Sequence, residues 1–249
     1  MDLGTLIGGI LGSALIWMAI ILGKSVGAFI SVNDLLLVFG GTVSLLMIKH
    51  QLKDVYNISS IFGKSLFVSH KCVESTIYTI QDMANIARND GVLALEKVKS
   101  ADTFMQHAID SATDGMDPAH LEAMLRSDLD ARGKRHQRGI TLCKDVGFFT
   151  LLMGIIATFI GGVQLVNTEG VVLSLAAVPQ VAIPMFYGFV VCAFTCALAG
   201  KLEFYSSDER FVDEIIIKGI KGIQHGINPR LLTHSLKGQL PPAQRGSIV

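Results

Sequence analysis

The chain has 249 residues, and its 21 Lys and Arg balance its 21 Asp and Glu, so its composition gives no indication of a nucleic-acid partner. Half of the residues are hydrophobic, and the mean hydropathy is +0.50. The apolar residues gather in runs near 20 residues, the length that crosses about 30 Å of hydrocarbon. These features argue against an ordinary soluble domain and predict an integral membrane protein.

Four apolar runs predict four transmembrane helices in two hairpins. They cover residues 3–22, 35–48, 146–166 and about 171–199. The first run contains Gly8 and Gly12, a small-xxx-small pair suited to close helix contact. A cleaved signal peptide is the competing interpretation of this run. It fits poorly, because Asp2 precedes the run where a basic segment would be needed.

The basic residues predict the orientation of the chain. Nearly all Lys and Arg lie in residues 49–144 and 201–249, and the positive-inside rule places these segments and both termini in the cytoplasm. We therefore expect a multi-pass protein of the bacterial inner membrane. The predicted domains are two transmembrane helices over 1–50, a cytoplasmic helical insert over 51–145, two further transmembrane helices over 146–200, and a helical C-terminal segment with a flexible tail over 201–249.

The cytoplasmic parts are predicted to be helical, which makes the whole chain an all-α membrane protein. Apolar residues at helical spacing carry this prediction. In the insert they are Val73, Ile77, Ile80, Ala84, Ala87, Phe104, Ala108, Ile109, Ala112, Leu121, Met124, Leu125 and Leu129, and in the C-terminal segment they are Phe204, Phe211, Ile215, Ile216, Leu231, Leu232 and Leu236. Asp117-Pro118 and Asn228-Pro229 are helix starts, and Gly226 is a helix end. The basic run 132–138 is interpreted as an anchor for anionic lipid.

No Asp, Glu, Lys, Arg or His lies in the interior of the four runs. A transmembrane ion carrier needs an ionisable group at depth. Either the chain transports nothing, or a partner supplies the carboxylate. Catalytic motifs such as HExxH, a P-loop or GxSxG are not found, and the four Cys form no CxxC pair. We therefore expect no enzymatic activity, no metal site and no cofactor.

Four sequence elements resemble the flagellar stator A-subunit family, MotA/PomA. They are MDLGTLIGGILG over 1–12, LLLVFGGT over 35–42, IARNDGVLALE over 86–96 and GIQHGINPRLL over 222–232. The resemblance runs through essentially the whole chain in the same order. It implies a homo-pentamer around a single-span MotB/PomB-like subunit, which carries the transmembrane aspartate and a peptidoglycan-binding domain. It also implies that ion flow turns the ring and that cytoplasmic charges push the rotor switch complex of the flagellum.

The resemblance also implies roles for individual residues. Arg88 and Glu96 match the family's rotor-facing charges, and a solvated helix face is the alternative interpretation of both. Thr158 matches the threonine that sodium-driven members use near the ion path, and Met185 is expected to face the same space. The alternative for Thr158 is a hydrogen bond to the carbonyl of its own helix four residues earlier. The coupling ion is sodium or a proton, and sodium is favoured.

The chain departs from the family pattern at three places, and the resemblance implies that the first two belong to the part that couples ion flow to movement. Leu151 stands where the family has a proline, and Pro184 and Met185 stand where it has two threonines. The proline near the inner end of the fourth span is also absent. Pro184 is expected to favour a helix kink. These departures leave open a structural ring paralogue without ion coupling, while the four spans and the NPR element argue against an ExbB/TolQ-like energiser.

Overall fold

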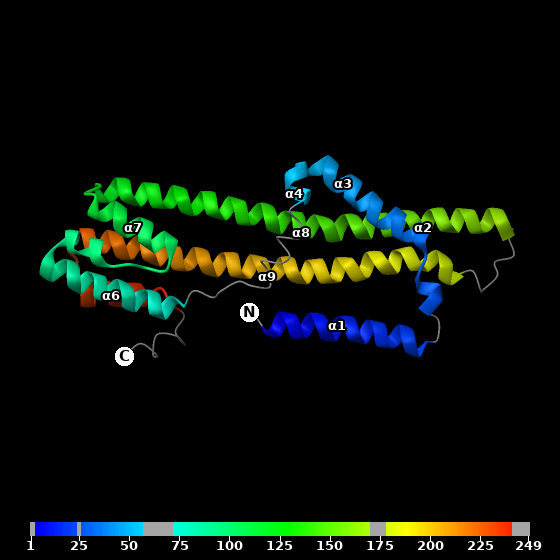
Figure 1. The fold of residues 1–249 in the computed structure, drawn as a ribbon, viewed down its shortest axis with the longest axis horizontal. Helices are drawn as coiled ribbons and strands as arrows, with labels where there is room; N and C mark the ends of the chain where they lie inside the picture. Colours follow the sequence, from blue (N-terminus) through cyan, green and yellow to red (C-terminus); the bar gives the residue numbers. More distant parts are fainter. Residues whose placement is uncertain (1–2, 24–25, 57–71, 170–177, 241–249) are drawn as a thin grey trace. The chain divides into compact units, whose positions relative to one another are not determined.

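The computed structural model describes residues 3–23, 26–56, 72–169 and 178–240, and within these ranges every regular element is a helix (Figure 1). The bounds are α1 Leu3–Leu22, the 3₁₀ helix η1 Val26–Phe29, α2 Val32–Leu35, the π-helix η2 Leu36–Gly40, α3 Gly41–Lys49, α4 Leu52–Tyr56, α6 Val73–Asp90, the 3₁₀ helix η3 Val92–Lys97, α7 Thr103–Thr113, α8 Pro118–Glu169, α9 Val178–Gln224 and α10 Pro229–Lys237. The all-α prediction is confirmed for this part of the chain.

In the part of the chain that the structure describes, three helical stretches are long and apolar enough to cross a membrane. They are Val32–Lys49, Pro118–Asn167 and Val181–Gln224, and a shorter apolar helix covers Leu6–Leu22. The four predicted runs therefore all contain apolar helix, although the number of spans stays a prediction. Part of the fourth run, residues 171–177, and the predicted tail from residue 241 lie outside the described residues.

Two long helices continue from the predicted membrane runs into the polar parts of the sequence. α8 covers Pro118–Glu169 and α9 covers Val178–Gln224, so the predicted domain limits at 145/146 and 200/201 fall inside helices. The chain forms two compact units. The first unit combines residues 1–69 with 137–203, and the second combines 70–136 with 204–249. Each long helix therefore contributes one part to each unit.

The second unit has an apolar core built from the predicted stripes. Its largest fully buried side chains include Ile77, Ile80, Leu95, Phe104 and Ile109, together with Leu121, Leu125, Ile215, Ile216 and Ile217. The helix starts at Asp117 and Asn228 are confirmed, because each side chain accepts a backbone N–H two residues later. Phe204 and Leu231 do not join the core and are 62 % and 66 % exposed. In α10 the buried stripe passes through Leu232 and Leu236, which turns Leu231 away from it.

Ion pairs connect α8 to α9 in the second unit. Arg132 bonds the fully buried Asp213 at 3.3 Å and lies over the ring of Phe104. The first residue of the basic run 132–138 thus pairs within the protein, and the lipid-anchor interpretation of the run stays a prediction. Lys221 and Arg126 donate to Glu122, and these hydrogen bonds hold the pKa of Glu122 below its usual value. A carboxylate with a lowered pKa stabilises the folded state wherever it is ionised.

In the first unit, α8 and α9 approach each other at glycines. A methyl group on Gly154 would lie 2.7 Å from the carbonyl oxygen of Pro184 and 3.3 Å from Cα of Gly188. On Gly188 it would lie 3.0 Å from both Cα of Leu151 and the carbonyl oxygen of Thr150. α9 continues through Pro184, whose carbonyl faces this contact. The two backbones therefore meet without intervening side chains, a contact that only glycine allows.

The second predicted run is not one uniform helix. A π-helical turn, Leu36–Gly40, separates α2 from α3, and such turns widen the helix by one residue. Directly after it, Thr42 donates to the Val38 carbonyl and lies 3.4 Å from the hydroxyl of Thr150 on α8. Both threonines are buried. This polar contact fixes the register of α3 against α8.

Gly154→Ala tests the backbone contact between α8 and α9. We expect it to lower the free energy of unfolding by about 1–3 kcal/mol, because the added methyl overpacks a rigid backbone contact. Gly162→Ala on the same helix is the matched control, since its methyl would meet only a Val181 side-chain carbon at 3.8 Å. In Gly162→Ala no steric clash offsets the gain in helix propensity of alanine over glycine, which is about 1 kcal/mol. Denaturation of the purified protein in detergent, followed by circular dichroism, measures both, and equal stabilities would contradict the packing argument.

The lowered pKa of Glu122 makes part of the stability dependent on pH. Glu122→Gln should lower the free energy of unfolding at neutral pH. Its difference in unfolding free energy from wild type should shrink as the pH falls below about 4.3, the usual pKa of a Glu side chain. The sign follows because protonation removes the charge that Lys221 and Arg126 bind. Thermal unfolding between about pH 7 and pH 3 measures it. In a Lys221→Met background the effect of Glu122→Gln should be smaller at neutral pH; an unchanged effect would refute the assignment.

Candidate functional site

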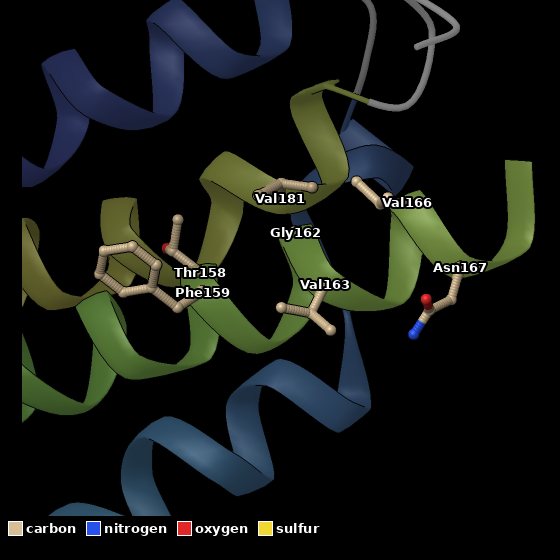
Figure 2. Close-up of a pocket in the computed structure, with 7 residues that line it drawn as sticks. All are labelled: Thr158, Phe159, Gly162, Val163, Val166, Asn167 and Val181. Carbon is tan, nitrogen blue, oxygen red and sulfur yellow. The ribbon is translucent and has the colours of Figure 1, made fainter. Parts of the chain in front are cut away.

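An open pocket of about 460 Å³ lies in the first unit, between α8 and the start of α9 (Figure 2). Its lining is Thr158, Phe159, Gly162, Val163, Val166, Asn167 and Val181. Among the described residues that line the pocket, Thr158 and Asn167 are polar and none is charged. The pocket therefore offers an apolar wall with one hydroxyl at one end and one amide at the other.

Thr158 is the predicted ion-path residue that lines this pocket. Its hydroxyl donates to the Gly154 carbonyl, four residues earlier, at 2.9 Å. This is the bond that the alternative interpretation of Thr158 expects. It uses the only hydroxyl proton and leaves the acceptor lone pairs of the oxygen available. Met185 is half-buried and is not one of the lining residues, so its role beside Thr158 stays a prediction.

Arg88 and Glu96, the predicted rotor contacts, lie in the second unit on adjoining elements. Arg88 is in the last turn of α6 and Glu96 is in η3, and both are exposed. Gly91 joins the two elements with a φ of 86°, a conformation that favours glycine. Neither charge forms an ion pair within the described part of the chain. Both are therefore available to a partner.

A charged cluster at the edge of the predicted spans was not anticipated. Asp145 is 8 % exposed, and its two carboxylate oxygens lie 2.7 Å from Lys49 Nζ and from His50 Nε2. Lys49 also lies over the ring of Phe149. The sequence places these residues at the ends of two separate runs, and only the fold shows that the ends meet. The cluster fastens the end of α3 to α8.

Tyr187 forms a second unanticipated contact, in the motif where the family threonines are replaced. Its hydroxyl donates to the Phe29 carbonyl and accepts from the Ser31 N–H at 3.4 Å. The ring of the neighbouring Phe186 packs edge-on against Phe29 with centroids 5.5 Å apart. The residues after Pro184 therefore hold the connection between α1 and α2.

A comparison with known proteins decides the family. No model of a protein family matches the sequence. The chemotaxis protein PomA of Vibrio alginolyticus is 32 % identical over 247 residues, which cover 98 % of each chain. This chain belongs to the MotA/PomA family of flagellar stator subunits. Motility protein A of Bacillus subtilis is a further relative, 27 % identical over 98 % of this chain and 93 % of its own.

Solved structures agree with this family in their fold. The flagellar MotAB stator complex from Bacillus subtilis contains a chain with a TM-score of 0.89, 23 % identity and 99 % coverage of both chains. A chain of C. jejuni MotAB gives a TM-score of 0.85 at 20 % identity, with 98 % coverage of both. The helical arrangement described above is therefore the MotA fold. As a MotA/PomA member the chain is a membrane protein of a flagellar motor stator, and the two relatives above are named as a chemotaxis protein and a motility protein.

Asp145→Asn tests whether the charged cluster stabilises the MotA/PomA fold. We expect a loss of about 1–3 kcal/mol, because Lys49 and His50 would keep their positions without an anionic partner. Glu203→Gln is the control: it removes a partner of Lys144, and both side chains of that pair are about half exposed. An exposed pair contributes at most about 1 kcal/mol. Denaturation in detergent compares the variants, and equal losses would show that burial of Asp145 is unimportant.

Proposed function

We propose that the chain is the A-type subunit of an ion-driven rotary stator unit, which converts cation flow into torque on the flagellar rotor. The full-length match to PomA carries this proposal. The interiors of the apolar runs contain no Asp, Glu, Lys, Arg or His, so a single-span MotB/PomB-like subunit supplies the ion-carrying aspartate. The two similar structures are those of MotAB from C. jejuni and of the MotAB stator complex from Bacillus subtilis, which supports a partner of this type.

The assembly that we propose is a homo-pentamer in the bacterial inner membrane. Each subunit crosses the membrane four times, with both termini and the second unit in the cytoplasm. The distribution of Lys and Arg over residues 49–144 and 201–249 supports this orientation. The exposed apolar residues of α1, among them Ile10, Leu15 and Met18, suit lipid or a neighbouring copy.

The proposed ion path passes the pocket at Thr158, with Met185 on the neighbouring helix. A hydroxyl oxygen with free lone pairs is a suitable ligand for a hard cation, and the Thr158 hydroxyl has such lone pairs after donating to Gly154. The apolar lining supports a dry environment, in which each ligand contributes more than it would in water. Sodium is the favoured coupling ion, with a proton as the other candidate.

The second candidate function is a structural ring paralogue without productive ion flow. One observation favours it: the Thr158 hydroxyl already bonds its own helix, so its polarity is satisfied without an ion. The replacement of the family's proline by Leu151, and of its threonines by Pro184 and Met185, points the same way. Dependence of rotation on sodium separates the two functions.

Thr158→Ala is the test of the ion path. If the stator is sodium-driven, losing one ligand in a dry site costs about 1–3 kcal/mol, and the sodium concentration for half-maximal rotation should rise about tenfold or more. Thr158→Ser keeps the oxygen and should be milder. The measurement is the rotation speed as a function of sodium concentration for the wild type, Thr158→Ala and Thr158→Ser. A response independent of sodium in every protein would remove the sodium motor and leave the ring paralogue or a proton motor, which rotation itself then distinguishes.

Arg88→Glu and Glu96→Lys test the proposed rotor contact. Each reversal should reduce swimming strongly with unchanged protein level, because complementary charge directs docking more than it stabilises the fold. The strain must carry no redundant stator. Arg230→Glu, an exposed charge on α10 in the same unit, is the control and should swim normally. Normal swimming in both reversal strains would count against the proposed contact.

A further inference from the structure

Pro184 removes one hydrogen bond from α9 at a point where the helix itself continues. It is buried inside Val178–Gln224, and a proline has no backbone N–H. In an uninterrupted helix that N–H would bond the carbonyl of the residue four positions earlier, which is Gln180. α9 is already helical at Gln180. The Gln180 carbonyl therefore lies within the helix but lacks its usual donor.

The contacts between α8 and α9 place Thr158 opposite this part of α9. A methyl group on Gly154 would approach the carbonyl oxygen of Pro184, and one on Gly161 would lie 3.9 Å from Cα of Val181. The two helices are therefore antiparallel, and residues 154–161 of α8 face residues 181–184 of α9. Thr158 lies one helical turn from each glycine, on the same face. Its side chain is therefore level with the stretch from Val181 to Pro184.

The Gln180 carbonyl oxygen is directed into the same stretch. Each carbonyl of an α-helix points along the axis toward the residue four positions later, which for Gln180 is Pro184. Residues four apart also share a face of the helix, and the face of α9 at Pro184 is turned toward Gly154 of α8. The Gln180 carbonyl and the Thr158 hydroxyl are therefore directed toward one space between the two helices.

These two oxygens cannot satisfy each other. The single proton of the Thr158 hydroxyl is donated to the Gly154 carbonyl at 2.9 Å, so none is left for Gln180. Asn167, the other polar residue among the described lining, lies at the opposite end of the pocket (Figure 2). Two acceptors thus face one apolar space, an arrangement that a cation stabilises. Carbonyls released by interruptions of membrane helices coordinate Na⁺ in transporters in the same way.

We propose that the main-chain carbonyl of Gln180, deprived of its helix donor by Pro184, is a ligand for the coupling cation opposite the Thr158 hydroxyl, and this inference rests on the proposed function. An amide carbonyl coordinates a hard cation but is not protonated at physiological pH. The site therefore selects a partly dehydrated alkali cation, sodium, over a proton. Pro184 stands where the family has a threonine, so the replacement exchanges a hydroxyl oxygen for a carbonyl oxygen and preserves the number of ligands.

The first experiment returns the missing donor to Gln180. Pro184→Ala restores the backbone N–H, so the carbonyl bonds within α9 and is lost to the ion. The sodium concentration for half-maximal rotation should rise about tenfold, the effect of losing one ligand. Gly200→Ala is the matched control. It also places Ala in α9, at an exposed position where the methyl meets no atom within 4 Å, and it should match wild type.

Sodium binding to the purified complex with its single-span partner gives a readout that does not depend on rotation. A bound ligand stabilises the folded state, so thermal unfolding in detergent reports binding as sodium chloride replaces choline chloride at constant ionic strength. The sodium concentration for half-maximal stabilisation should rise about tenfold in Pro184→Ala. It should be unchanged in Gly200→Ala. An equal shift in both variants would assign the effect to a stiffer helix and overturn the inference.

The double variant Thr158→Ala/Pro184→Ala tests whether both oxygens hold the same ion. Groups that bind one ligand are coupled, so Pro184→Ala should have a smaller effect in the Thr158→Ala background than in wild type. Fully additive effects would place the oxygens at separate sites and overturn the inference. So would wild-type sodium dependence of Pro184→Ala beside a shifted Thr158→Ala, an outcome that leaves the proposed function standing. Sodium-independent rotation and unfolding of the wild type would remove the sodium motor together with this site.

Discussion

The close contact between α8 and α9 is the constraint on which the rest of the structure depends. Gly154 and Gly188 bring the two backbones together, and the carbonyl of Pro184 lies in this contact. The same two helices continue into the second unit, where buried and half-buried ion pairs such as Arg132–Asp213 join them again. In an apolar medium, packing of this kind is the main attraction between helices, because burial of apolar surface from lipid gains little. Within each unit, these contacts therefore set the register of α8 against α9.

The candidate site is positioned by polar contacts that side chains of the first unit make on α8 and α9. Thr158 lies one turn after Gly154 on α8 and donates to its carbonyl, so the glycine that allows close packing also sets the direction of the hydroxyl. The Asp145 cluster fastens α3 to α8, and Tyr187 fastens the connection between α1 and α2 to α9. The membrane helices are thus tied to the α8–α9 pair at separate points, each of them polar and each satisfied.

In the described part of the second unit, the charged residues on α8 and α9 form ion pairs, whereas those at the junction of α6 and η3 do not. Along α8 and α9 the charges pair with one another, as in Glu122 with Lys221, and contribute to stability. At the junction of α6 and η3, Arg88 and Glu96 stay exposed and without an ion pair in the described chain. Unpaired charge adds nothing to the fold, but it directs encounter with a complementary surface. This difference separates the supporting part of the unit from its proposed contact surface.

The sequence by itself determined the helical class, the apolar runs, the core stripes such as Ile77 and Ile80, the helix starts at Asp117 and Asn228, and the family. These features depend on local spacing, capping chemistry and motif order, all of which are present in the linear chain. Only the tertiary structure decided that α8 and α9 are continuous, that Asp145 meets Lys49 and His50, and that η2 is a π-helical turn. Those outcomes depend on which distant residues come together, and spacing along the chain carries no information about that.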